Sequence, residues 1–174
     1  MAVHRLNHAV LYVRDVQRSA AFYADALGFA PIPGMPPIPG AAFLRAPGST
    51  NDHDLALFAV GASAGASAAG RGTVGLYHLA WEVDTLADLA ETADRLAGLG
   101  ALKGSSDHST TKALYAEDPD GLEFEVCWLV PADQITDEML EARARILPLD
   151  IDREIARFGA DRRSGTGISR PVSV

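Results

Sequence analysis

Two stretches of alternating apolar and polar residues, each followed by a helical pattern, recur in this chain at a constant spacing. Residues 6–29, LNHAVLYVRDVQRSAAFYADALGF, align without a gap on residues 76–99, LYHLAWEVDTLADLAETADRLAGL, at an offset of 70. A histidine stands third in each copy, as His8 and His78. Because side chains alternate between the faces of a strand, each copy is predicted to form a strand and then a helix.

Both predicted helices have start and stop signals. The first begins near Asp15, and the second begins at Thr85, where Asp88 three residues later is close to a capping box. Gly28 and Gly98 suit the left-handed position just past each helix. The predicted inward stripes are Val16, Ala20, Tyr23 and Leu27 in the first helix, and Leu86, Leu89, Ala93 and Leu96 in the second.

Shorter strand-like segments follow each helix, at 41–46 and 54–60 in the first copy and at 111–118 and 122–129 in the second. We interpret each copy as a βαβββ unit. We predict an α+β fold of residues 1–130, in which two tandem units, 1–60 and 73–130, form a curved mixed sheet around a metal cavity. The Gly-, Ala- and Ser-rich segment 61–72 is predicted to be a flexible linker.

A C-terminal helical extension is predicted at 131–159. Thr136 would cap its main helix, Pro148 would end it, and a short helical piece would follow at 151–158. The apolar stripe of the main helix would contain Ile135, Met139, Ala142 and Ile146. The tail, residues 160–174, is predicted to be disordered.

Composition narrows the set of partners. The 174 residues carry a net charge of −8, so the chain has no overall attraction for nucleic acid or anionic lipid. We also expect no signal peptide and no membrane span. The single cysteine, Cys127, cannot form an internal disulfide, which favours a cytoplasmic location.

The strand pattern points to a metal site. With the bulkier faces packed on the helices, His8, His78 and Glu125 all point away from the helix layer. Two imidazoles and one carboxylate on the uncovered face of a sheet form a facial triad, which leaves open positions on the metal and suits Fe(II) or Mn(II). A carboxylate in the apolar strand around DPDGLEFEVCW is then explained as a metal ligand.

The segments HAVLYVRDVQRSAAFYADALGF, YHLAWEVDTLADL and DPDGLEFEV resemble the vicinal oxygen chelate superfamily over residues 4–130. That superfamily includes extradiol catechol dioxygenases, glyoxalase I, fosfomycin-resistance transferases, methylmalonyl-CoA epimerase and metal-free drug-binding proteins. This chain looks closest to single-module extradiol catechol dioxygenase-like proteins. The resemblance implies Fe(II), with Mn(II), Zn(II) or Ni(II) as alternatives, and a homodimer.

Three features choose among the relatives. Glyoxalase I and the epimerase use a fourth protein ligand, but aligning DLALF on GLEFE puts Phe58 opposite Glu125. Fosfomycin transferases resemble this chain but carry an arginine soon after the ligand glutamate. The segment that follows Glu125 here, VCWLVPAD, contains no arginine, which disfavours that class. By analogy with extradiol dioxygenases, DHSTTKALYAEDPDGLEFE places His108 and Tyr115 as the acid–base pair.

The sequence and the resemblance together predict an Fe(II)-dependent extradiol-type dioxygenase that cleaves a small catecholic ring with O2. A metal-dependent isomerase, a thiol transferase or a metal-free aromatic-binding protein are the alternatives. The remaining polar candidates are assigned minor roles. His4 is peripheral, and His53 could line the mouth of the site but is more typical of a surface residue. Glu82 and Glu123 are expected to face solvent or make a hydrogen bond, and Cys127 is expected to be a buried filler rather than a soft ligand.

Overall fold

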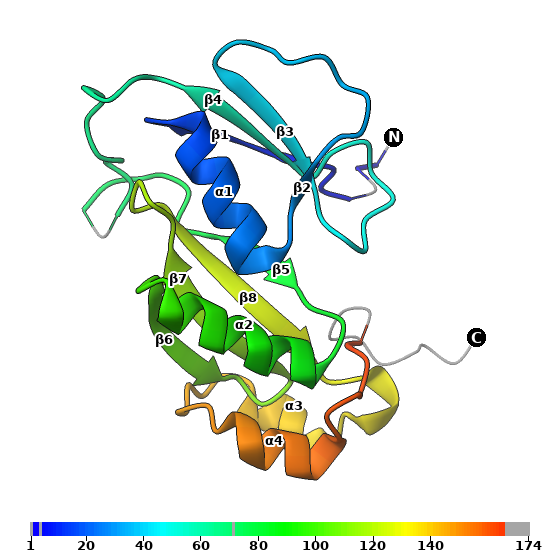
Figure 1. The fold of residues 1–174 in the computed structure, drawn as a ribbon. Coiled ribbons are helices and arrows are strands. Elements are labelled where there is room, and N and C mark those ends of the chain that lie inside the picture. The colour runs from blue at the N-terminus through cyan, green and yellow to red at the C-terminus, as the bar shows by residue number, and fades with distance from the viewer. Residues whose placement is uncertain (1, 4, 71, 166–174) are drawn as a thin grey trace. The chain divides into compact units, whose positions relative to one another are not determined.

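The first repeat folds as a four-stranded sheet covered by one helix. The computed structural model describes residues 2–3, 5–70 and 72–165 (Figure 1). Its first compact unit, unit 1, extends to Ala68 and also contains Asp118–Leu122. The elements of unit 1 are β1 (Ala9–Val13), α1 (Val16–Leu27), β2 (Ala30–Pro31), β3 (Ala41–Arg45) and β4 (Leu55–Ala59), with strand order β1-β4-β3-β2. Strands β1 and β4 are parallel, and the other neighbours are antiparallel.

Local signals fix the ends of α1. The Asp15 carboxylate accepts hydrogen bonds from the backbone N–H groups of Gln17 and Arg18, which satisfies donors that the helix itself leaves free. At the other end Gly28 has φ 73°, a left-handed conformation that glycine adopts without steric cost. Both features were predicted and are confirmed. Helix α1 packs on β3 and β4, over the fully buried Leu55 and Leu57.

The second repeat has the same topology. The second compact unit, unit 2, comprises Ala69–Glu117 and the chain from Glu123 onward. Its elements are β5 (Leu79–Glu82), α2 (Leu86–Gly98), β6 (Leu102–Asp107), β7 (Thr111–Glu117) and β8 (Glu123–Leu129), in strand order β5-β8-β7-β6. Strand β5 is parallel to β8, as β1 is to β4. Two βαβββ units with mixed sheets confirm the predicted α+β fold class.

Two β-bridges and helix α4 connect the C-terminal extension to the rest of unit 2. After a 3₁₀ turn at Ala132–Gln134 come α3 (Asp137–Ala142) and α4 (Ile151–Phe158). Helix α4 contacts α2, and the Phe158 ring lies 5.4 Å from the fully buried Trp128 ring of β8. The Trp128 Nε1–H donates to the backbone oxygen of Arg162. The extension therefore completes the hydrophobic core of unit 2.

Three predicted details are wrong. Gly98 ends α2 as a helical residue, and Gly100 takes the left-handed conformation with φ 67°. Helix α3 ends at Ala142, because the chain then extends to pair Leu147 with Asp107, and Ile146 is exposed rather than part of an apolar stripe. Residues 160–165 are not disordered, since they include backbone hydrogen bonds from Ser164 to Asp84 and from Gly165 to Leu129. The rest of the predicted tail, 166–174, lies outside the described residues.

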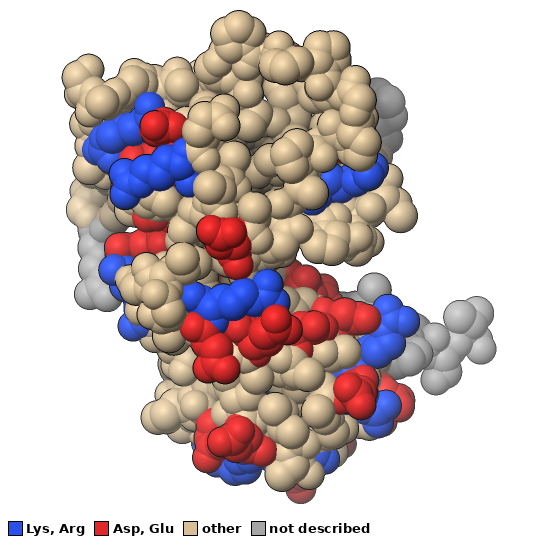
Figure 2. All heavy atoms as spheres, viewed as in Figure 1, with Lys and Arg blue, Asp and Glu red and all other residues tan. Residues whose placement is uncertain are grey.

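Charged side chains of both signs are interspersed on the face shown in Figure 2. On that face, the Lys and Arg side chains have Asp and Glu side chains beside them. Among the described residues, no helix combines the length and the apolar composition needed to cross a membrane.

Candidate metal and acid–base site

Unit 2 brings His78 and Glu125 into contact on the sheet face opposite α2. Glu125 of β8 pairs with Ala80 of β5, and His78 precedes β5 by one residue. The His78 Nε2 atom lies 3.1 Å from Glu125 Oε2, and both side chains are mostly buried. The other ring nitrogen, Nδ1, is buried without a hydrogen-bond partner in the described structure. An imidazole and a carboxylate in this state are suitable ligands for a divalent cation.

His108 and Tyr115 form a hydrogen-bonded pair on the same sheet face. Tyr115 of β7 pairs directly with Glu125 of β8. His108, just after β6, places its Nε2 atom 3.0 Å from the Tyr115 hydroxyl. Burial, with the nearby Glu125 carboxylate, raises the pKa of Tyr115, so this phenol stays protonated as a donor at neutral pH. The Tyr115 and His78 ring centroids are 6.0 Å apart, which makes these four side chains one cluster.

In unit 1, His8 lies just before β1 on the face away from α1. Its Nδ1 atom is 2.8 Å from the Asn7 side-chain oxygen, which leaves Nε2 as the ring nitrogen available to a ligand. Asn51 supports this segment by donating to the Asn7 backbone oxygen and to Asp54. Burial alone would raise the pKa of Asp54, but hydrogen bonds from Ala46 N, Ser49 and Asn51 outweigh it and hold the pKa below the usual value.

His53 lies beside His8, and the sequence interpretation underestimated it. The two imidazole centroids are 4.4 Å apart, and the His53 side chain is 18% exposed, so it is not a surface residue. Its Nδ1 atom is 3.0 Å from the Asp52 carboxylate, and its ring packs edge-on against Phe43. A signal was present in the sequence, because a histidine flanked by acids in NDHD precedes a strand that is parallel to the one after His8. His4, the other minor candidate, lies outside the described residues.

Strand pairing corrects the position predicted to lack a fourth ligand. The repeat offset of 70 makes Val10 the equivalent of Ala80. Val10 pairs with Ala56, whereas Ala80 pairs with Glu125. The equivalent of Glu125 in unit 1 is therefore Ala56, and the alignment that chose Phe58 was two residues out of register. Alanine offers no ligand atom, so the inference that this position lacks a ligand holds with a different residue.

The remaining candidates in unit 2 behave largely as predicted. Cys127 is a buried thiol, and its pKa is raised to about 12, first by burial and then by Glu125 and Glu82. Glu123 is exposed. Within each unit, the described residues contain no group of three His, Cys, Asp or Glu side chains that could hold a metal ion. Since His8 belongs to unit 1 while His78 and Glu125 belong to unit 2, the three-residue site stays a prediction.

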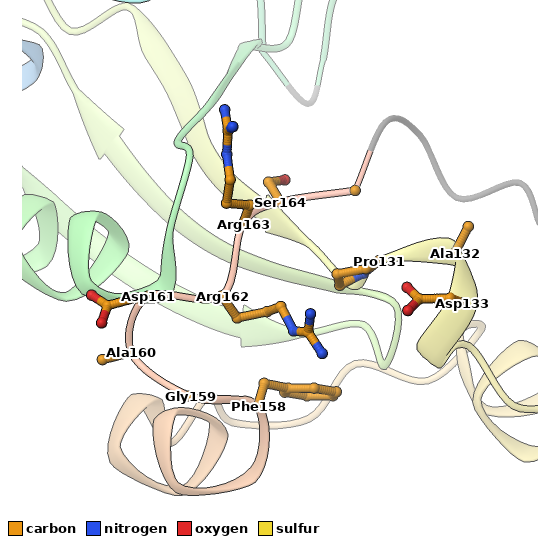
Figure 3. Close-up of a pocket in the computed structure, with 11 residues that line it drawn as sticks. Pro131, Ala132, Asp133, Phe158, Gly159, Ala160, Asp161, Arg162, Arg163 and Ser164 are labelled. Carbon is orange, nitrogen blue, oxygen red and sulfur yellow. The ribbon is translucent and has the colours of Figure 1, made fainter.

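A pocket of unit 2 lies elsewhere, between residues 131–133 and 158–165 (Figure 3). None of the predicted site residues lines it. Its charged residues are two arginines, Arg162 and Arg163, and two aspartates, Asp133 and Asp161, so it has no excess of either charge. Arg163 also points away from Arg162 in Figure 3 and binds Asp84 at 2.9 Å. Nothing in this pocket favours an anionic ligand over a cationic one.

A family model matches residues 5–126, and its description is the glyoxalase/bleomycin resistance protein/dioxygenase superfamily. The chain belongs to this superfamily. The match covers both repeats, which confirms the resemblance drawn from the sequence motifs. Members of the superfamily catalyse different reactions, so membership alone does not choose a reaction for this chain.

One similar curated protein is metapyrocatechase 2 from Cupriavidus necator, which is 31% identical over 100 residues. The match covers 58% of this chain but only 27% of that protein, so this chain spans about a quarter of its relative's length. The similarity connects the superfamily domain to a dioxygenase without assigning that activity here.

Solved structures share the fold at low identity. A glyoxalase/bleomycin resistance protein/dioxygenase domain from Frankia sp. EAN1pec has a TM-score of 0.61 and 23% identity, covering 74% of this chain and 94% of that one. A fosfomycin resistance protein from Listeria monocytogenes has a TM-score of 0.55 and 16% identity, covering 82% and 99%. A lactoylglutathione lyase from Agrobacterium tumefaciens has a TM-score of 0.52 and 23% identity, covering 73% and 95%. These likenesses show the fold of the chain.

Proposed function

We propose that this protein is a non-heme Fe(II)-dependent extradiol-type dioxygenase that cleaves a small catecholic ring. The observation that carries the proposal is the hydrogen bond between His108 and Tyr115, on the same sheet face as His78 and Glu125. An acid–base pair beside two candidate metal ligands is the arrangement that a proton-dependent reaction of a chelating substrate requires. Similarity to metapyrocatechase 2 supports the same reaction class.

The proposed metal ligands are His8, His78 and Glu125. The side chains of unit 2 fit a metal, because His78 Nδ1 has no partner and Nε2 already faces a carboxylate. His8 fits because Asn7 occupies its Nδ1 atom and leaves Nε2 for a metal. Bound Fe(II) would supply open coordination positions for the catechol oxygens and O2, and Mn(II), Zn(II) or Ni(II) could occupy the same ligands.

The protein residues manage protons in this proposal. Tyr115 keeps its proton because its pKa is raised, and it donates a hydrogen bond to a substrate oxygen. His108, hydrogen-bonded to Tyr115, exchanges protons with the substrate, as an imidazole does best near neutral pH. The overall reaction adds both atoms of O2 to the catechol, and the opened ring carries an aldehyde and a carboxylic acid.

His53 is a second candidate proton-handling residue, proposed from geometry alone. Its ring adjoins the candidate ligand His8, and Asp52 binds its Nδ1 atom. A carboxylate in that position fixes the orientation of an imidazole. We therefore propose that His53 handles protons of the bound substrate from unit 1.

One observation disfavours a four-ligand isomerase. In unit 1, Ala56 stands where unit 2 has Glu125, so the proposed ligand set keeps vacant positions for a chelating substrate. A fosfomycin transferase is disfavoured because the eight residues after Glu125, VCWLVPAD, contain no cationic side chain to bind a phosphonate.

The resemblance to the superfamily also predicts a homodimer. The molar mass measured by light scattering tests this prediction.

Metal analysis tests the ligand set first. Glu125→Gln, His78→Ala and His8→Ala should each lower the iron bound after anaerobic reconstitution, because each removes a ligand. Glu123→Gln is the matched control, since Glu123 lies two residues from Glu125 on the same strand and face and is exposed. Equal iron content in Glu125→Gln and Glu123→Gln would overturn the ligand assignment.

Activity tests the reaction. Iron-loaded protein with O2 should convert a simple catechol to a yellow ring-opened product, measured by absorbance and by O2 uptake. His108→Ala should lower kcat by roughly 10²–10⁴-fold with iron content unchanged, the usual contribution of general acid–base catalysis. Tyr115→Phe, which loses only the hydroxyl, should also lower kcat. No O2 uptake across a broad catechol panel would reject the dioxygenase proposal.

A further inference from the structure

The turn that carries His108 is held by a buried charged cluster that reaches the C-terminal helix α4. Lys112 of β7 is fully buried on the α2 side of the sheet, where it pairs with Trp128 of β8. Its Nζ atom lies 2.5 Å from Asp107 Oδ1 and 3.0 Å from Glu154 Oε2. Glu154 of α4 is 1% exposed and Asp107 is 6% exposed. A buried lysine between two buried carboxylates fixes all three side chains in one arrangement, because any unpaired member would be a buried charge.

Asp107 connects the buried cluster to the turn that carries His108. Its Oδ1 atom also accepts a 2.7 Å hydrogen bond from the backbone N–H of Ser109. Ser109 has φ 66°, the left-handed conformation that residues with a Cβ rarely adopt. Such a conformation persists only where the surroundings impose it, and such sites are common beside functional residues. His108 lies between Asp107 and Ser109, so both of its neighbours are fixed by one carboxylate.

The C-terminal extension also forms hydrogen bonds with the backbone of Asp107. The Asp107 N–H donates to Leu147 O at 2.8 Å, and the Leu147 N–H donates to Asp107 O at 3.1 Å. Arg153, at the surface of α4, approaches Asp107 Oδ2 at 3.5 Å and Glu154 Oε1 at 3.2 Å. The extension thus reaches the residue before His108 by a β-bridge and by the buried cluster.

We propose that Glu154 and Lys112 are positioning residues that hold His108 against Tyr115, so that α4 serves the candidate acid–base pair. The assignment rests on the proposed function for the catalytic role of His108. The positioning itself is a property of unit 2 and can be measured without turnover. It gives a role to a segment beyond residue 126, where the family match ends.

The test variant is Glu154→Gln, which keeps the shape of the side chain and removes its charge. Asp152→Asn is the matched control, because it removes the same charge from an exposed position on the same helix. The first readout is the ring ¹⁵N spectrum of His108 in the full-length metal-free protein, assigned by the signal missing in His108→Ala. The second is kcat and KM of the iron-loaded protein on catechol, below the melting temperature of every variant.

In Glu154→Gln, the His108 ring signals should shift towards those of an imidazole that exchanges between tautomers, because its contact with Tyr115 loosens. The kcat should fall about tenfold or more, part of the roughly 10²–10⁴-fold that an acid–base group contributes, while KM changes little. Asp152→Asn should match the wild type in both readouts. A purely stabilising role would lower the melting temperature without moving the His108 signals.

The two readouts separate the proposals. Folded Glu154→Gln with wild-type His108 signals overturns the positioning role, whatever the activity. Shifted signals in a protein that never cleaves catechol overturn the proposed function and leave the positioning role standing. If Glu154→Gln does not fold, Glu154→Asp keeps the buried charge, withdraws it from Lys112 and is judged by the same two readouts.

Discussion

Replacing Lys112 by methionine should destabilise unit 2 by far more than removing a surface lysine. Methionine keeps an unbranched apolar stem of similar length, so the substitution mainly removes the ammonium group. That group is 1% exposed and pairs with Asp107 and Glu154. Without it, two carboxylates stay buried side by side and lose the charge that compensates them.

The expected cost follows from burial. Breaking a buried ion pair by removing one partner costs about 3–5 kcal/mol. Arg153 remains close to both carboxylates, but its side chain is 60% exposed, so it compensates them only in part. We therefore expect a loss of about 3 kcal/mol in the free energy of unfolding. At roughly 2–4 °C per kcal/mol for a chain of this size, the melting temperature should fall by about 6–12 °C.

Urea unfolding followed by circular dichroism measures the loss. Lys103→Met on neighbouring β6 is the control, because Lys103 pairs with Glu117 at 2.9 Å but its side chain is 50% exposed. A surface pair of that kind contributes about 0–1 kcal/mol. If Lys112→Met and Lys103→Met lower the free energy of unfolding equally, then burial does not set the strength of the Lys112 cluster and the reasoning fails.

Three further predictions concern other residues. Because the pKa of Asp54 is lowered in the folded protein, its ionised carboxylate stabilises the fold at pH values above the ordinary aspartate pKa of about 3.9. This stabilisation is lost as the pH falls through the lower pKa of the folded state. The difference in free energy of unfolding in urea between wild type and Asp54→Asn should therefore shrink between pH 7 and pH 3. Equal differences at both pH values would contradict it. The pKa of Cys127 is raised to about 12, so a fraction of roughly 10⁻⁴ of this thiol should be ionised at pH 8. Cys127 should therefore react with a disulfide reagent far more slowly in the native protein than in denaturant. Similar rates in the two conditions would refute this prediction. A chain ending at Pro131 lacks the Phe158 ring and the backbone acceptor that enclose Trp128, so its tryptophan emission should shift to longer wavelength and its melting temperature should fall. An unchanged spectrum and melting temperature would show that the extension is dispensable.

The sequence predicted features that local physics decides. Asp15 and Thr85 cap helices because their side chains accept the free N–H groups of the first turn, and both caps are present. Helix α4 begins at Ile151 and ends at Phe158, as its pattern predicts. Strand faces also followed from alternation, so His78, Tyr115 and Glu125 are on one face of the unit 2 sheet.

Features that depend on pairing between distant segments were harder to predict. The register of β4 against β1 decides between Ala56 and Phe58, and no local signal encodes a shift of two residues that preserves the face. The end of α3 depends on the bridge between Leu147 and Asp107, which a helical pattern cannot show. The nearness of His53 to His8 likewise comes from tertiary contacts.

The strand pattern also marks Lys112 as a buried lysine. Alternation in TKALYAE puts Lys112 on the same face as Leu114 and Ala116, the face that packs on the helices. A lysine at a buried position needs an acidic partner, so the sequence alone predicts a buried carboxylate nearby. It does not identify the partner, because Glu154 approaches from 42 residues further along the chain.

The turn Asp118–Leu122 has a consequence for how the gene can be divided. It joins two strands of unit 2, yet it belongs to unit 1, where Arg14 binds Asp120 and the Tyr23 hydroxyl donates to Asp118. Cutting the coding sequence at the 61–72 linker would therefore separate each of these side chains from its partner. Burial raises the pKa of Asp118, so separating the turn from unit 1 should return that pKa towards its ordinary value. The two halves should be complementing fragments that recover native structure on mixing, rather than ancestral domains that fold alone.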